Sequence, residues 1–148
     1  MKRMRRILHP TDFSSASRSA FARALGLARD SRAELIILHV LAPVIPMMGE
    51  GYVPPQTYEA IDAAAHKGGR RKLDALVTRA KTAGVRARGM LAEGSAHERV
   101  VRAAKSLRAD LIVMGTHGRS GLARLFVGSV ASRVVSAAPC PVMTVRGR

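Results

Sequence analysis

Short aliphatic runs alternate with helical patterns along this chain of 148 residues, and that alternation restricts the fold more than any other feature. Residues 33–40 (AELIILHV) and 110–115 (DLIVMG) are near-continuous apolar runs, which are typical of strands covered on both faces. Weaker runs predict further strands at 5–9, 85–91 and 141–145. Between the runs, apolar residues at helical spacing predict four helices, around positions 20–28, 73–80, 100–107 and 130–135.

The resulting order, βαβαβαβαβ, predicts an α/β fold. Strands that alternate with helices form a parallel sheet with right-handed crossovers and helices on both faces. Such sheets bind ligands beyond the carboxyl ends of their strands, where the strand order reverses. We therefore expect a functional site just after Leu8, Val40 and Met114.

Polar residues and glycine mark the expected helix ends. Ser14 or Ser15 can cap the first helix, and Ser95 followed by Glu98 predicts a capping box at the start of the third. Gly84 is the expected stop of the second helix. These signals give the predicted helices definite boundaries.

Residues 1–148 read as a single domain, without a repeat or an interdomain linker. Prolines and glycines rule out a regular element through most of residues 42–56, which form either a loop that covers a site or a tolerated surface insertion. The basic residues 1–6 precede only two apolar residues, and the apolar stretch 35–48 is shorter than the roughly 20 residues of a membrane span. With a lone cysteine, Cys140, the chain forms no intrachain disulfide. We expect a soluble, cytoplasmic protein.

The most informative motif follows the fourth predicted strand, with the spacing G-x2-G-x9-G-S. Gly115 and Gly118 would let the backbone pass close to a ligand, while Gly128 and Ser129 open the next helix. The first amides of a helix and its positive dipole end suit a phosphate, and Arg119 can add charge. The motif predicts a phosphate cradle. The alternative, in which the glycines only permit tight turns, stays open.

Three residues after the first strand are the neighbouring candidates. Pro10, Thr11 and Asp12 fall at the predicted carboxyl end, where a carboxylate can accept hydrogen bonds from ribose or hold a divalent cation. Asp12 could instead cap the first helix, and the two roles stay open. Val40, at the end of the second strand, could offer backbone groups to an adenine edge.

Three segments resemble the universal stress protein family in its ATP-binding branch: ILHPTDFS, ADLIVMGTHGRSGLARLFVGSVASRVV and APCPVMTVR. The resemblance implies a five-stranded parallel sheet in the order 3-2-1-4-5. It also implies a nucleotide site, with ATP as the ligand and Mg²⁺ as a candidate companion held through Asp12. The site residues that it implies are Pro10, Thr11, Asp12, Val40, Met114, Gly115, His117, Gly118, Arg119, Gly128, Ser129 and Val130.

The sequence favours a regulator whose nucleotide occupancy tunes its conformation or its dimer contacts. It lacks the G-x4-G-K-[ST] motif of P-loop enzymes and a G-x-G-x-x-G after the first strand. Residues 115–129 contain no Asp or Glu to activate water, so His117 is the only candidate base there. A slow ATPase or an autophosphorylating protein is the enzymatic alternative.

The net charge of +15 suits an anionic partner. Cations divide evenly, with 12 in residues 1–74 and 13 in residues 75–148, and only 3% of residues are aromatic. Nucleic acid bases would find few aromatic side chains to stack on. The favoured interpretation is that the cations lie on solvated helix faces, and nucleic acid is an unlikely partner. The third alternative is a nucleotide-independent protein that either interacts with other proteins or binds nucleic acid without specificity.

The end of the chain predicts an edge strand. Cys140 lies between two prolines and reads as a buried thiol, and Pro141 suits a sheet edge. The resemblance implies a homodimer through residues 141–145, besides a protein partner of unknown identity.

His9 and His39 read as packed residues, whereas His66 and His97 fall on helix surfaces without metal-ligand spacing. The spacing of the histidines thus predicts no metal site.

Overall fold

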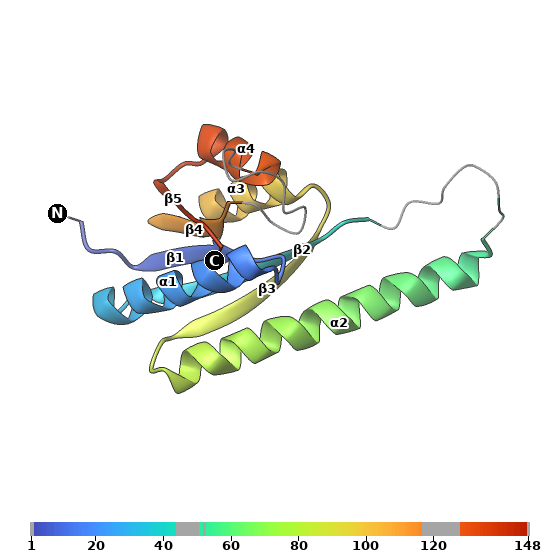
Figure 1. Cartoon of the computed structure of the whole chain (residues 1–148), viewed down its shortest axis with the longest axis horizontal. Helices are drawn as coiled ribbons and strands as arrows, with labels where there is room; N and C mark the ends of the chain where they lie inside the picture. The colour runs from blue at the N-terminus through green and yellow to red at the C-terminus, as the bar shows by residue number, and fades with distance from the viewer. Residues whose placement is uncertain (1, 44–50, 52, 117–127, 148) are drawn as a thin grey trace.

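The computed structural model describes residues 2–43, 51, 53–116 and 128–147. Strands and helices alternate along the chain as the sequence predicts (Figure 1). The elements are β1 (Arg6–Pro10), α1 (Ser15–Ser31), β2 (Glu34–Leu41), α2 (Pro55–Thr82), β3 (Ala87–Glu93), α3 (Ala96–Ser106), β4 (Leu111–Gly115), α4 (Ser129–Ala137) and β5 (Val142–Val145).

All five strands form one parallel sheet in the order β3-β2-β1-β4-β5, which confirms the predicted fold. β1 lies at the centre and pairs with β2 on one side and β4 on the other. The order reverses between these neighbours, so the carboxyl ends of β1, β2 and β4 meet where an open α/β sheet binds ligands.

Helices cover both faces of the sheet. α1 and α2 lie on one face, and α3 and α4 lie on the other (Figure 1). Alternate residues of β1 serve the two cores: Ile7 packs with Phe21 and Leu73, and Leu8 packs with Val100 and Val134. Burial on both faces explains why the central strands read as continuous apolar runs.

The second helix is much longer than its apolar pattern predicts. α2 has 28 residues and begins at Pro55, so it includes the last two residues of the segment 42–56, which the sequence predicts to be irregular through most of its length. Proline suits the first turn of a helix because the missing N–H is unpaired there anyway. Buried positions in α2 start only at Gly69, and the half before it extends past the sheet (Figure 1).

Two predicted helix boundaries are confirmed and one is wrong in detail. Ser14 caps α1 by accepting a hydrogen bond from the Ser17 N–H. Gly84 follows α2 with φ of +82°, a conformation that favours glycine. Ser95 precedes α3, but its hydroxyl contacts His97 Nδ1 at 3.1 Å and makes no cap hydrogen bond. The predicted capping box therefore does not form.

β5 forms one edge of the sheet, as Pro141 suggested. The Pro141 carbonyl accepts a hydrogen bond from the Ile112 N–H at 3.0 Å, which joins the strand to β4. Cys140 is only partly buried, which corrects the expectation of a buried thiol; burial and then Asp110 raise the pKa of that thiol. Among the described residues, no helix is long and apolar enough to span a membrane.

Candidate functional site

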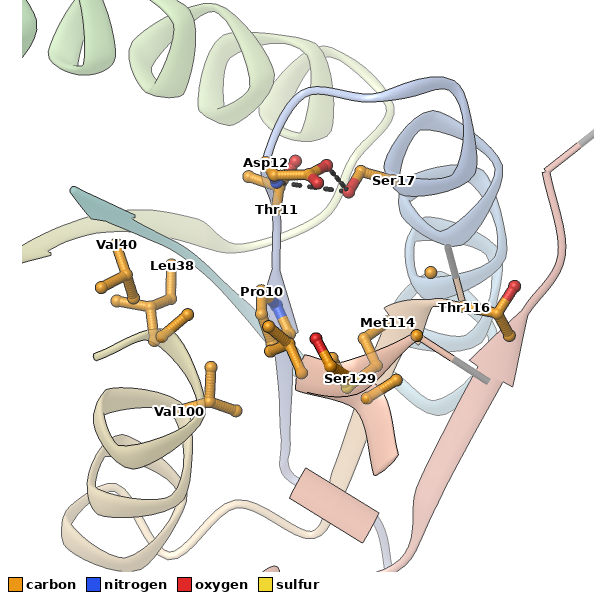
Figure 2. A pocket seen from close by; sticks show the side chains of 15 residues that line it. Pro10, Thr11, Asp12, Ser17, Leu38, Val40, Val100, Met114, Thr116 and Ser129 are labelled. Carbon is orange, nitrogen blue, oxygen red and sulfur yellow. Dashed lines mark hydrogen bonds between the residues drawn. The ribbon is translucent and has the colours of Figure 1, made fainter. Parts of the chain in front are cut away.

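A cavity of about 230 Å³ opens at the carboxyl ends of β1, β2 and β4 (Figure 2). The first turns of α3 and α4 close its sides. Its lining residues are Pro10, Thr11, Asp12, Ser17, Leu38, Val40, Ala96, Val100, Met114, Gly115, Thr116, Gly128, Ser129, Val130 and Ala131. This is the place that the sheet topology selects for a ligand.

The cavity brings together residues that lie far apart in the sequence. Of the twelve predicted site residues, nine line it: Pro10, Thr11, Asp12, Val40, Met114, Gly115, Gly128, Ser129 and Val130. The other three, His117, Gly118 and Arg119, lie outside the described residues. The roles of all twelve in binding stay predictions.

Asp12 is held by the start of α1. Its Oδ1 accepts hydrogen bonds from the Ser17 hydroxyl at 2.7 Å and from the Ser14 N–H at 2.9 Å. The Asp12 N–H donates back to the Ser17 hydroxyl at 3.2 Å (Figure 2). Since Ser14 itself caps the helix, Asp12 supports the capping residue and also lines the cavity. The two roles weighed for Asp12 are therefore compatible.

The turn that carries Asp12 is tied to β2. The Thr11 N–H donates to the Leu38 carbonyl at 2.8 Å, and His39 Nδ1 donates to the Thr11 carbonyl at 2.7 Å. Phe13, with φ of +62°, packs its ring 4.5 Å from the His39 ring. His39 thus positions this turn, which goes beyond the packed role expected for it.

Val40 lies just past the end of the β1 ladder. The last β1–β2 partners are Pro10 and Leu38, and Val40 pairs with Ala92 on the β3 side. Backbone groups of a strand point alternately to its two neighbours. The Leu38 carbonyl bonds toward β1, so the backbone groups of Val40, two residues on, face the same side beyond Thr11. This position suits the predicted contact with a planar ligand edge.

Gly115 is needed for packing as well as for the cavity. A Cβ at this position would lie 2.8 Å from the backbone carbonyl carbon of Ala16 and 2.9 Å from its Cβ. Because α1 crosses β4 so closely, any side chain would force a shift. This close packing is a reason for glycine that neither interpretation of the motif named, and Gly115 also lines the cavity.

The N-terminus of α4 faces the cavity. Gly128 is the residue before the helix and makes no side-chain cap hydrogen bond, and Ser129 and Val130 form the first turn. The Gly128 N–H donates to the Thr116 carbonyl, which anchors this turn to the end of β4. Helix amides without a side-chain cap form a ready site for an anion.

Six lining residues escaped the sequence reasoning: Ser17, Leu38, Ala96, Val100, Thr116 and Ala131. Ser17 lies one helical turn after the capping Ser14, a spacing that could have signalled its bond to Asp12. Thr116 follows Gly115 directly, and its buried hydroxyl has no hydrogen-bond partner among the described residues. Val100 and Ala131 belong to the apolar patterns of the predicted helices, and Ala96 carries no signal of its own.

His9 lies under the site in the sheet and is fully buried. Its Nδ1 donates to the Val113 carbonyl at 2.8 Å, and its Nε2 has no partner within the described part of the chain. Burial lowers the pKa of His9 from 6.5 to about 4, against smaller raising effects of the Val113 hydrogen bond and of Asp12. His9 is therefore neutral at pH 7.

A second cluster of ionisable groups lies on the surface of α2 and at the end of β3. His66 Nδ1 is 3.6 Å from Asp62 Oδ1, and His66 Nε2 is 3.7 Å from Glu93 Oε2. One ligand atom from each of the three residues lies within 4.8 Å of the others, a proximity that the spacing of the histidines alone did not reveal. All three side chains are open to solvent, and we assign them no ligand.

Comparison with known proteins settles the family. A model of the Universal stress protein family matches residues 4–146. The chain belongs to the universal stress protein family. Universal stress protein MJ0531 of Methanocaldococcus jannaschii is 34% identical over 144 residues, which cover 96% of this chain and 82% of that protein.

Solved structures agree with the fold. Protein MJ0577 of Methanocaldococcus jannaschii superposes with a TM-score of 0.86 at 23% identity, and the match covers 99% of both chains. A universal stress protein solved in complex with cAMP has a TM-score of 0.68 and 27% identity, over 99% of this chain and 100% of that one. The first likeness concerns the fold alone, and the second comes from a protein that holds a nucleotide.

Proposed function

We propose that this universal stress protein binds ATP in the cavity at the carboxyl ends of β1, β2 and β4. One observation carries the proposal. The Asp12 turn and the N-terminus of α4, over a hundred residues apart in the chain, line the same cavity. A carboxylate can accept hydrogen bonds from sugar hydroxyls, and the amides at the start of a helix can bind phosphate. A cavity that holds both groups suits a nucleotide.

The lining of the cavity offers suitable groups to the ribose, the base and the phosphates of ATP. Asp12 would accept hydrogen bonds from the ribose hydroxyls, and the apolar side chains of Val40 and Val100 would contact the faces of the base. Gly128 and Ser129 would donate backbone N–H groups to the phosphates. The volume of about 230 Å³ is below the roughly 300–1,000 Å³ of sites that enclose a whole ligand. The base and ribose would fill it, and the phosphates would extend along the start of α4.

The cavity favours binding over hydrolysis. Among the described residues that line it, Asp12 alone has an ionisable side chain, and its Oδ1 already accepts two hydrogen bonds. An ATPase needs a base placed on the attacking water. Mg²⁺ would enter with the triphosphate, and Asp12 is the carboxylate that could contact it. We therefore propose a nucleotide-responsive regulator of the cytoplasm.

Nucleotide occupancy could reach the edge of the sheet through a short path. The Thr116 N–H, at the cavity, donates to the Val145 carbonyl of β5 at 3.0 Å. β5 leaves one side of its backbone for pairing, which is how two copies of a chain can join. We propose a homodimer through Val142–Val145, with contacts that respond to the ligand.

Calorimetry with ATP, ADP, AMP and cAMP tests the nucleotide site. Val130, 38% exposed on the first turn of α4, lines the cavity, whereas Val135, 53% exposed on the same helix, does not. Val130→Glu should weaken ATP binding at least about tenfold by repelling phosphate, and Val135→Glu should leave the affinity unchanged. Equal affinities of the two variants, or no ATP binding by the wild type, would refute the proposal.

A companion pair tests the carboxylate. Asp12→Ala should lose affinity for ATP, whereas Asp30→Ala removes an exposed carboxylate near the other end of α1 and should not. Since Asp12 also supports the Ser14 cap, the melting temperature of both variants is measured first. An Asp12→Ala protein that is folded and binds ATP like the wild type would remove Asp12 from the site.

A further inference from the structure

Arginine side chains cluster at the end of the sheet opposite the cavity, where the strands begin. Parallel strands all begin at the same end of a sheet, so the segments that lead into them lie together there. The segment before β1 brings Arg3 and Arg5, β1 itself begins at Arg6, the end of α1 brings Arg32, and the segment before β3 brings Arg86. The fold thus collects cations that are far apart in the sequence.

These side chains surround a shallow hollow of about 370 Å³, here named the arginine hollow. Its lining consists of five arginines with one glutamate and one methionine: Arg3, Met4, Arg5, Arg6, Arg32, Glu34 and Arg86. One backbone hydrogen bond and one from a side chain to the backbone hold the parts in place. The Glu34 N–H donates to the Arg5 carbonyl at 2.9 Å, and Arg86 Nη2 donates to the Arg32 carbonyl at 3.2 Å.

The acidic groups of this edge are already engaged. Glu34 Oε1 pairs with Arg88 Nε at 2.7 Å. Asp110 Oδ2 accepts hydrogen bonds from the N–H groups of Arg5 and Arg6, and its Oδ1 lies 3.9 Å from Lys2 Nζ. Within the described ranges, no carboxylate lies within 4.0 Å of a guanidinium nitrogen of the five arginines that line the hollow.

Local structure accounts for only part of this charge. Arg32 is the C-cap of α1, where the negative end of the helix dipole favours a cation. Arg6 Nη1 donates to the Leu107 carbonyl at the end of α3, which has the same effect. Arg86 Nη2 likewise donates to the carbonyl of Arg32, the C-cap of α1, and leaves the other N–H donors of Arg86 available. Arg3 and Arg5 make no helix-end contact among the described residues, so their guanidinium groups remain for an external anion.

We propose that the arginine hollow binds the phosphate backbone of a nucleic acid duplex. Guanidinium groups contact phosphate oxygens in a planar, paired geometry, and five of them around one hollow match the closely spaced charges of a duplex. Only 3% of residues are aromatic, which leaves little for the stacking that single strands need. The binding is therefore independent of base sequence. The sequence predicts the opposite, because few aromatic residues argue against nucleic acid as a partner. Their scarcity disfavours single strands, however, and the even spread of cations along the chain does not show this surface.

Fluorescence anisotropy of a short labelled DNA duplex, over a series of salt concentrations, tests the proposal. The double variant Arg3→Gln/Arg86→Gln should weaken binding and reduce the slope of log affinity against log salt by about 1.8, or about 0.9 per lost phosphate contact. The matched control Arg70→Gln/Arg71→Gln removes the same charge from exposed positions of α2, beside Gly69, which packs on His39 toward the other end of the sheet. The control should keep the wild-type slope.

A charge-preserving variant and competing ligands complete the test. Arg3→Lys/Arg86→Lys keeps the charge and should retain most of the slope, whereas loss in this variant as deep as with glutamine would overturn a phosphate role. No duplex binding at the lowest salt, or equal loss in the control, overturns the proposal. Tighter binding to phosphatidylserine vesicles or to polyglutamate would assign the surface to another class of partner. Saturating ATP should not displace the duplex, so this result does not depend on the ATP site.

Discussion

The two ends of the same sheet offer an anion two different kinds of site. At the carboxyl ends, a cavity with a mostly apolar lining presents the backbone amides at the start of α4. At the amino ends, the arginine hollow presents charged side chains on an open surface. Fixed amides in a shaped cavity select a ligand by geometry, whereas exposed guanidinium groups attract phosphate at long range and are screened by salt. The comparison shows that the common direction of the strands places the two kinds of anion-binding group at opposite ends of the sheet.

The largest expected effect is the pH dependence of the free energy of unfolding that buried His9 causes. His9 has a pKa of about 4 against 6.5 when unfolded, so the unfolded chain takes up a proton that the folded chain refuses as the pH falls. The free energy of unfolding should therefore drop by roughly 3 kcal/mol between pH 6.5 and pH 4, at about 1.4 kcal/mol per unit. Urea unfolding at several pH values measures it.

The matched pair for this measurement is His9→Asn and His97→Asn. The asparagine at position 9 can still donate to the Val113 carbonyl but does not titrate, so that variant should lose this part of the pH dependence. His97, near the start of α3, is a partly exposed histidine, and its replacement should leave the dependence in place. The same pH profile for His9→Asn and the wild type would contradict the assignment.

The next effect tests how tightly the cavity wall is packed. Gly115→Ala should lower the free energy of unfolding by about 2 kcal/mol, because its Cβ would meet the Ala16 backbone at 2.8 Å. The control Gly26→Ala places a Cβ where nothing lies within 4 Å and should stabilise α1 by about 1 kcal/mol. Thermal unfolding compares the two. Opposite signs support the close approach of α1 to β4, and equal signs contradict it.

A smaller effect belongs to the amino ends of the strands. Hydrogen bonds from the Arg5 N–H, chiefly, and from the Arg6 N–H lower the pKa of Asp110. A carboxyl whose pKa is lowered by folding stabilises the fold above its usual pKa and loses that effect as the pH falls through its folded value. Asp110→Asn should thus cost about 1 kcal/mol at pH 7 and little in acid. Asp30→Asn, which alters a carboxylate 78% exposed, is the control and should change little at either pH.

The smallest effect sharpens the contrast between stability and binding. Arg88 and Glu34 form an exposed pair, so Glu34→Gln should change the free energy of unfolding by less than about 1 kcal/mol. Among the described residues, Glu34 is also the one acidic side chain that lines the arginine hollow, and the variant removes its charge. Duplex binding should therefore tighten, as anisotropy would detect. Weaker binding in this variant would argue against electrostatic recognition.

Sequence reasoning reached the fold because each strand carries its own signal. The run at 33–40 became β2 within a residue at each end, since a strand buried on both faces must be apolar throughout. The strand order came from the family resemblance, because the runs themselves do not say which neighbours they pair with. Asp12 and Ser129 could be placed together only through that order.

What escaped prediction depends on contacts between distant segments. The long first half of α2 carries few buried residues, so its helix left no apolar period to detect. The left-handed backbone of Phe13 is held by packing on His39, a residue 26 positions later in the chain. The arginine hollow was hidden because cations counted along the chain are evenly spread, and only the common start of parallel strands brings them together.

The hydrogen bonds around Asp12 have a consequence for evolution and for engineering. Ser14 and Ser17 orient that carboxylate when α1 forms, before any ligand arrives. A side chain left to rotate freely would lose about 1 kcal/mol of rotational entropy on meeting a sugar hydroxyl, and here folding has already removed that freedom. Ser17 at the cavity wall and Ser14 outside the lining can thereby tune how long a ligand stays.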